Sequence, residues 1–148
     1  MLSLILRFFL SVITCTLFIS ISGTQIVLAN VDRFGLPPLS IAERFNSTAY
    51  DLLNFAPILA VVVLAAYLIG FTVAWLLGKW WLKISIWGFI AGLTAVPTAV
   101  MLINSLVGIE VFYITTQPAG WFVLLTGSVL GSMVFYFKKI SEEINLHD

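Results

Sequence analysis

The stretch LLNFAPILAVVVLAAYLIGFTVAWLLG, residues 52–78, decides the class of fold. It is 27 residues long, contains no Asp, Glu, Lys, Arg or His, and holds 15 Leu, Ile, Val or Phe side chains. A helix needs about 20 apolar residues to cross a hydrocarbon core about 30 Å thick. The apolar run at 61–64 also lacks the period of two that a membrane-barrel strand shows. The stretch therefore predicts one membrane-spanning helix.

The remaining charges separate three further tracts of the same kind. Only 9% of the 148 residues are charged and 61% are hydrophobic, whereas about 25% of a soluble domain is charged. Uncharged tracts occupy residues 8–31, 84–109 and 111–137. The sequence thus predicts an all-α membrane protein, a single domain over residues 1–148 that forms a bundle of four transmembrane helices. The predicted helices cover about residues 5–29, 52–78, 84–108 and 118–140.

The first tract permits two interpretations. Arg7, the apolar stretch that follows it and the small-residue ending Val27-Leu28-Ala29 resemble a cleavable signal peptide. The tract is 24 residues long, however, whereas the apolar region of a signal peptide usually has about 7–15 residues. We expect a retained helix. A mature chain that began at Asn30 would contradict this expectation, because the first helix would then have been cleaved off.

Positive charges predict the orientation. Lys and Arg in short loops favour the cytoplasmic side of a membrane. Counted along the chain, five of the seven Lys and Arg residues lie before the first uncharged tract, after the second or after the fourth, which are three regions on one side. The sequence therefore predicts that both termini are cytoplasmic. These five residues are Arg7, Lys79, Lys83, Lys138 and Lys139.

The connection at residues 30–51 is the only long one, and it would face outward. The run GLPP at 35–38 indicates a turn. Ser40 and Glu43 have the spacing of a capping box, which marks the start of a helix. Ile41 and Phe45 then lie on an apolar side, opposite charged residues. We expect a short amphipathic helix at the membrane interface that leads into the second span.

Small residues predict close packing of the third and fourth spans. Each span carries a GxxxG motif, which allows two helix backbones to approach closely. A rise of about 1.5 Å per residue places the two motifs at similar depth in an antiparallel pair. Gly88 would then lie nearest Gly131, and Gly92 nearest Gly127. The predicted packing residues are Gly88, Gly92, Ala95, Ala99, Gly127 and Gly131.

Pro97 lies near the middle of the third predicted helix. Proline lacks the N–H that would bond to the carbonyl four residues earlier, so helices kink there. We expect a kink after Leu93, with Thr94 or Thr98 bonding the freed carbonyl groups.

The four tracts contain no Asp, Glu, Lys, Arg or His. These are the side chains that usually form a proton relay or a catalytic site inside a membrane. Cys15 is the only cysteine, His147 is the penultimate residue, and Glu110 is a lone carboxylate between two spans. We therefore expect no catalytic residue, no cofactor and no metal site. A net charge of zero also excludes the basic surface that nucleic-acid binding requires.

Several short patterns resemble a family of short, uncharacterised bacterial inner-membrane proteins. They are Asp51-Leu52-Leu53, Ala56-Pro57, Trp75-Leu76-Leu77 and the run NSLVG at 104–108. The resemblance covers about residues 50–137. It implies four spans and a location in the cell inner membrane, and it implies no activity.

The sequence leaves two candidate functions open. The first is a non-enzymatic accessory, assembly or regulatory component of a membrane complex, embedded in the lipid bilayer and bound to another membrane protein or to a second copy. The alternative is an oligomeric passive channel or transporter component that is not coupled to protons. Its path would be lined by Thr94, Thr98, Ser128 and Ser132.

Overall fold

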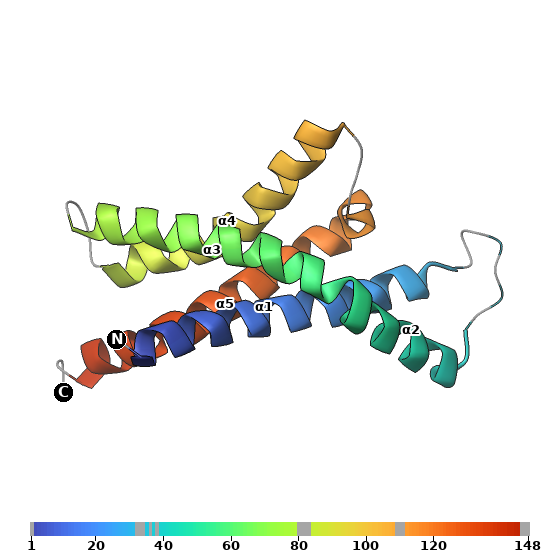
Figure 1. Ribbon diagram of the computed structural model, residues 1–148, viewed down its shortest axis with the longest axis horizontal. Helices are drawn as coiled ribbons and strands as arrows, with labels where there is room; N and C mark the ends of the chain where they lie inside the picture. The colour runs from blue at the N-terminus through green and yellow to red at the C-terminus, as the bar shows by residue number, and fades with distance from the viewer. Residues whose placement is uncertain are drawn as a thin grey trace.

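The described part of the chain is entirely helical (Figure 1). In a computed structural model, it comprises residues 2–31, 35, 37, 39–79, 84–108 and 112–145. No strand occurs within these ranges. The elements are α1 (Leu2–Ala29), α2 (Ile41–Asn54), α3 (Ala56–Gly78), α4 (Ile84–Val107), the 3₁₀ helix η2 (Tyr113–Thr116) and α5 (Pro118–Asn145).

Within the described residues, four helices are long and apolar enough to cross a membrane. This number agrees with the four uncharged tracts and is typical of a multi-pass membrane protein. The apolar segments have lengths between 19 and 26 residues. They are Leu4–Ala29, Ala56–Gly78, Trp87–Val107 and Pro118–Tyr136.

The helix that precedes the second span is present and starts where its capping residues predict. Ser40 is the N-cap, its side chain accepts from the Glu43 backbone N–H, and the Glu43 carboxylate accepts from the Ser40 backbone N–H at 2.8 Å. The helix ends at Asn54, and α3 begins only at Ala56. Pro57 accounts for this break, because its ring has no N–H and crowds the carbonyl group of Leu53.

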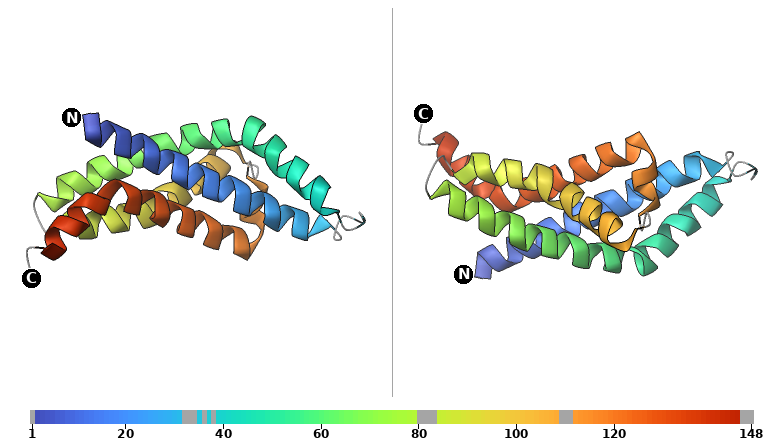
Figure 2. Two further views of the ribbon diagram at one scale, coloured as in Figure 1. Left: turned by 90° about the horizontal axis from the view of Figure 1, so that it is seen from below. Right: turned by 90° about the horizontal axis from the view of Figure 1, so that it is seen from above.

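The helices pack as two layers around a shared core. α1 contacts α3 and α5, and α4 contacts α3 and α5. α1 begins and α5 ends at the same end of the bundle, whereas α2 and η2 lie at the opposite end (Figures 1 and 2). α4 is one helix through Pro97, and it bends visibly along its length (Figure 1), as the proline predicts.

The core contains small polar side chains as well as apolar ones. Leu59, Val63 and Leu124 are at most 1% exposed. Tyr67 is fully buried among them, and its hydroxyl donates a hydrogen bond to the Ser128 carbonyl at 2.6 Å. A phenol buried in this way requires a partner. The bond therefore ties α3 to α5 inside the bundle.

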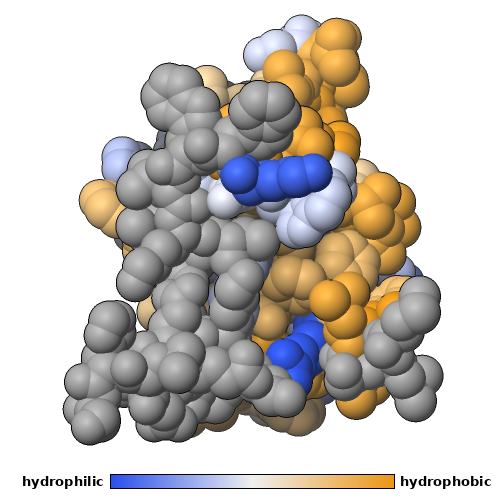
Figure 3. Space-filling model, turned by 90° about the vertical axis from the view of Figure 1, so that its left-hand side faces the viewer, coloured by the Kyte–Doolittle hydropathy of each residue, from blue (hydrophilic) through white to orange (hydrophobic). Residues whose placement is uncertain are grey.

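Large apolar side chains cover the outside of the bundle. Leu6, Ile69 and Phe122 lie on three different helices and are between 65 and 70% exposed. Seen from the end where α1 begins, the coloured surface is largely hydrophobic, with hydrophilic residues in separate patches (Figure 3). An apolar exterior of this extent is typical of contact with lipid.

Candidate functional site

The two glycine motifs do not face each other. On α4, Gly92 faces α5: a Cβ added there would collide with the Ser132 side chain, and the Ser128 hydroxyl donates to the Gly92 carbonyl. A Cβ added at Gly88 would lie 2.5 Å from the Tyr136 ring. The α4 motif therefore does allow α4 to approach α5 closely.

The α5 motif faces α1 instead, and at Gly131 also α3. A Cβ at Gly127 would lie 2.6 Å from Ile19 Cγ1, and one at Gly131 would collide with the Tyr67 hydroxyl of α3 and lie 2.8 Å from Cys15 Cβ of α1. The expected pairs Gly88–Gly131 and Gly92–Gly127 are therefore wrong. Depth along the helix does not determine which side of it a residue occupies, because successive residues are rotated by about 100°.

The remaining packing residues of α4 divide between two neighbours. Ala95 faces α3, where its Cβ would lie 3.0 Å from a Cβ added at Gly70. Ala99 is partly buried against the common core. The Leu93 carbonyl group is the one that Pro97 leaves without a backbone partner. The Thr94 hydroxyl donates instead to the Ile90 carbonyl at 2.9 Å.

The four residues of the expected channel path also lie apart. Thr94 and Thr98 are exposed beside α3, in a groove of about 290 Å³. Ser128 and Ser132 are at most 2% exposed and lie against α4. One protomer therefore does not place these four side chains along a single path.

A cavity of about 690 Å³ lies at the end of the bundle that carries α2 and η2. We call it the end cavity. It is lined by residues of α1, α2, the α2–α3 junction, α3, the segment 112–114 and α5. None of its residues was predicted as a site from the sequence.

Side-chain hydrogen bonds hold α2 against α1 beside this cavity. The Thr24 hydroxyl lies 2.6 Å from Asp51 Oδ2 and also 2.8 Å from the Ser20 carbonyl. Gln25 Nε2 donates to Thr48 Oγ1 at 2.9 Å. Because α2 is short and exposed, these bonds determine where its Asp51 end lies.

The opposite wall is held by a second group of bonds. Trp121 Nε1 donates to the Thr115 carbonyl at 3.0 Å, and Asn104 Nδ2 donates to Thr115 Oγ1 at 3.1 Å. Gly120 allows η2 to lie directly on α5, since a Cβ there would collide with the Ile114 backbone. The segment 112–114 is thereby fixed as a wall of the cavity.

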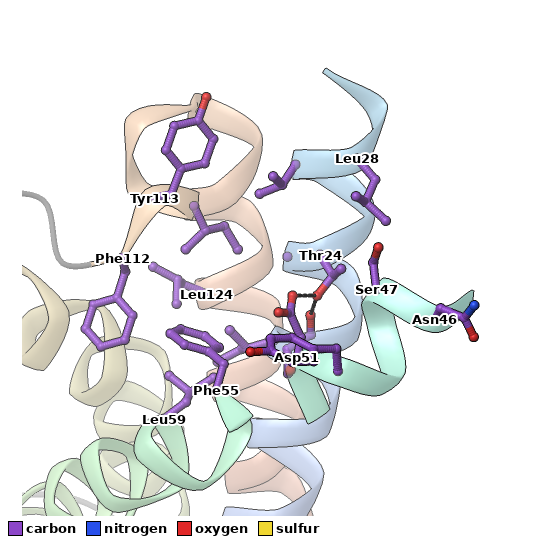
Figure 4. Close-up of a pocket in the computed structure, with 16 residues that line it drawn as sticks. Thr24, Leu28, Asn46, Ser47, Asp51, Phe55, Leu59, Phe112, Tyr113 and Leu124 are labelled. Atoms are coloured by element: carbon purple, nitrogen blue, oxygen red, sulfur yellow. Dashed lines mark hydrogen bonds between the residues drawn. The ribbon is translucent and has the colours of Figure 1, made fainter. Parts of the chain in front are cut away.

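The lining is mostly apolar and carries a few polar groups. Figure 4 shows Phe55, Leu59, Phe112, Leu28 and Leu124 around the end cavity, with Asp51 beside Phe55 and bonded to Thr24. Among the described residues that line the cavity, Asp51 is the only Asp, Glu, Lys or Arg. The site can thus hold an apolar group and a polar head at the same time.

Ser20 also lines the end cavity, although it is only 3% exposed. Its hydroxyl has no hydrogen-bond partner within the described residues. Buried hydroxyl groups are nearly always bonded, and one without a partner costs about 1–3 kcal/mol. The Ser20 hydroxyl is therefore an unsatisfied polar group, buried in a residue that lines the cavity.

Other sequence candidates do not belong to this site. Lys83, Glu110 and His147 lie outside the described residues. Cys15 lies on α1 and is buried against α5. The described residues contain no group of three His, Cys, Asp or Glu side chains that could hold a metal ion.

Two signals in the sequence could have pointed to the end cavity. The first predicted helix is rich in hydroxyl side chains towards its end, among them Ser20 and Thr24, and the capped helix after it ends near Asp51. Comparison of the chain with protein-family models, with curated proteins and with solved structures gives no match. The resemblance to bacterial inner-membrane proteins thus stays a prediction.

Proposed function

We propose that the protein is a non-enzymatic accessory component of the bacterial inner membrane that works by binding an amphiphilic molecule in the end cavity. The observation that carries this proposal is a cavity of about 690 Å³ with a mostly apolar lining and a few polar groups, among them Thr24 and Asp51. Ligand sites in proteins commonly have about 300–1,000 Å³ and are mostly apolar, with a few placed polar groups.

The depth of the end cavity supports an amphiphile. α1 has 28 residues and is about 42 Å long at about 1.5 Å per residue, which exceeds a hydrocarbon core of about 30 Å. Its last turns, which line the cavity, therefore reach the level of the lipid head groups if the helix is centred in the bilayer. An amphiphile there would place its apolar part among Phe55 and Leu59 and its head near Thr24.

The distribution of charge supports an orientation with both termini in the cytoplasm. Arg7 lies near the start of α1, and Lys79 follows α3 at the same end of the bundle. Positive charge favours the cytoplasmic side. The end cavity then opens towards the outer side of the membrane.

Native mass spectrometry tests ligand binding in the end cavity. Protein released from a mild non-ionic detergent should retain a bound amphiphile, and Leu28→Trp should reduce that retention because Leu28 lines the cavity. Ala29→Trp is the matched control, since Ala29 is exposed and does not line it. Equal retention by the wild type and both variants would contradict the proposal.

The accessory role has its own test. Purification of the protein from its membrane in the same detergent should bring down another membrane protein, or a second copy, in stoichiometric amount. A protein that is monomeric and alone, yet mediates solute flux in liposomes, would favour the channel instead.

A further inference from the structure

We propose that the end cavity selects amphiphiles whose head group is an ammonium, and that Asp51 receives that charge. This inference rests on the proposed function, since it concerns which amphiphile the same site takes. It is carried by the position of Asp51, by the unpartnered Ser20 hydroxyl and by the charge of the lining.

Asp51 is a carboxylate with unused hydrogen-bonding capacity. A carboxylate has about four acceptor positions, and within the described residues Asp51 accepts one bond, from Thr24 at 2.6 Å. No described cation pairs with it. The other charged residues of α2 are Glu43, which is bonded to Ser40, and Arg44, which does not line the cavity.

Thr24 orients this carboxylate before a ligand arrives. Its hydroxyl has a single proton and lies within hydrogen-bonding distance of both Asp51 Oδ2 and the Ser20 carbonyl. This contact holds the end of α2 against α1 and turns the Asp51 carboxylate towards Thr24 (Figure 4). A preoriented acceptor loses less side-chain freedom when it binds a donor.

Ser20 is the second feature that indicates a polar ligand. Its hydroxyl is buried without a partner in the described part of the chain, and its residue lines the same cavity one turn of α1 before Thr24. An ammonium group has up to three N–H donors. One of them can bind Asp51, and rotation of the buried Ser20 side chain towards the cavity would let another bind its hydroxyl.

The charge of the lining favours a cation over an anion. The carboxylate of Asp51 is the only charged group among the lining residues that the structure describes. Phe55, Leu59 and Leu124 lower the local dielectric constant, which strengthens the attraction of a carboxylate for a cation. An anionic head group would be repelled, and an uncharged one would leave the carboxylate unpaired.

Two sources can supply this chemistry: an aminophospholipid of the bilayer or a free long-chain amine. The first experiment adds dodecylamine, dodecanol or dodecanoic acid to the purified protein and measures retention by native mass spectrometry. We expect the amine to bind at least about tenfold more tightly than the alcohol, as an ion pair worth about 1.4 kcal/mol or more requires.

A second arm uses lipid nanodiscs that contain equal amounts of phosphatidylethanolamine and phosphatidylglycerol. Enrichment of phosphatidylethanolamine on the released protein identifies the bilayer lipid as a source, and preference for dodecylamine identifies the free amine. Either result supports ammonium selection. Absence of both preferences overturns it.

Asp51→Asn separates this inference from the proposed function. The amide keeps an acceptor for Thr24 but removes the charge, so the preference for the amine should fall to within about twofold of the alcohol. Glu43→Gln removes a charge from the same helix outside the cavity and should leave the preference unchanged.

If Asp51→Asn keeps the full preference, ammonium selection by Asp51 is wrong. If the amine and the alcohol bind equally, and Leu28→Trp weakens both, the cavity binds amphiphiles without this selectivity. If Leu28→Trp weakens neither, the proposed binding site itself is wrong.

Discussion

The Thr24 hydroxyl lies 2.6 Å from Asp51 Oδ2, although the two residues are 27 positions apart in the chain. The contact joins α1 to the last turn of α2. It also brings together the only charged residue among the described lining of the end cavity and one of the hydroxyl groups there. The same bond therefore contributes both to the position of α2 and to the chemistry of the cavity.

Thr24→Val should destabilise the contact between α1 and α2. The substitution keeps the shape of the side chain and removes a bond to a charged group, which is worth about 1.5–3 kcal/mol. We expect a lower melting temperature in detergent and weaker binding of dodecylamine. The double variant with Asp51→Ala should be less destabilised than the sum of the two single variants, because both Thr24→Val and Asp51→Ala remove the same bond. Strict additivity would show that the two side chains act independently.

Gly92→Ala should destabilise the packing of α4 against α5. A Cβ at this position would collide with the Ser132 side chain, and the Gly92 carbonyl accepts from Ser128. Overpacking of this kind costs about 1–3 kcal/mol. Ser132→Gly removes the obstructing side chain and should restore part of the melting temperature in the double variant. Equal melting temperatures for Gly92→Ala and the wild type would show that α4 and α5 are further apart.

The start of α2 should loosen in acid. Hydrogen bonds from the Ser40 side chain and then from its backbone N–H hold the pKa of Glu43 below its ordinary value. Because the folded pKa is the lower one, the stabilisation is complete above the ordinary pKa of Glu and is lost as the pH falls through the lowered value. Hydrogen exchange of the first amide groups of α2 should speed up over this range. Glu43→Gln should remove that pH dependence, and a variant that keeps it would assign the change to another group.

Cysteine labelling tests the orientation. Cys15 is the only cysteine and is fully buried, so it should react slowly with a membrane-impermeant maleimide. Asn46→Cys, on exposed α2, should be labelled in intact cells, whereas Lys79→Cys should be labelled only after the membrane is opened. The reverse pattern would place the end cavity on the cytoplasmic side.

Much of the fold follows from the position of charges. Residues 52–78 contain no charge, and α3 occupies most of that stretch. Ser40 and Glu43 likewise marked the start of α2 correctly. The predicted start of the second span, at residue 52, was less accurate, since α3 begins at Ala56. Pro57 separates α2 from α3, which are otherwise almost continuous.

The candidate site was beyond the reach of such patterns. Ser20, Thr24 and Asp51 come from two helices, and their meeting depends on how α2 folds back along α1. The partners of Gly127 and Gly131 were missed for a related reason. Both residues face α1, Gly131 also faces Tyr67 of α3, and their neighbours Ser128 and Ser132 face α4.

The sequence by itself determined that four long apolar helices form and which residues each one covers. Charged groups are costly inside a bilayer, so they mark the ends of such helices. Only the tertiary structure decided which side of each helix meets which neighbour. Helix formation depends on residues within a few turns, whereas the rotation of a helix about its axis depends on all the side chains packed against it. The end cavity is a product of that packing.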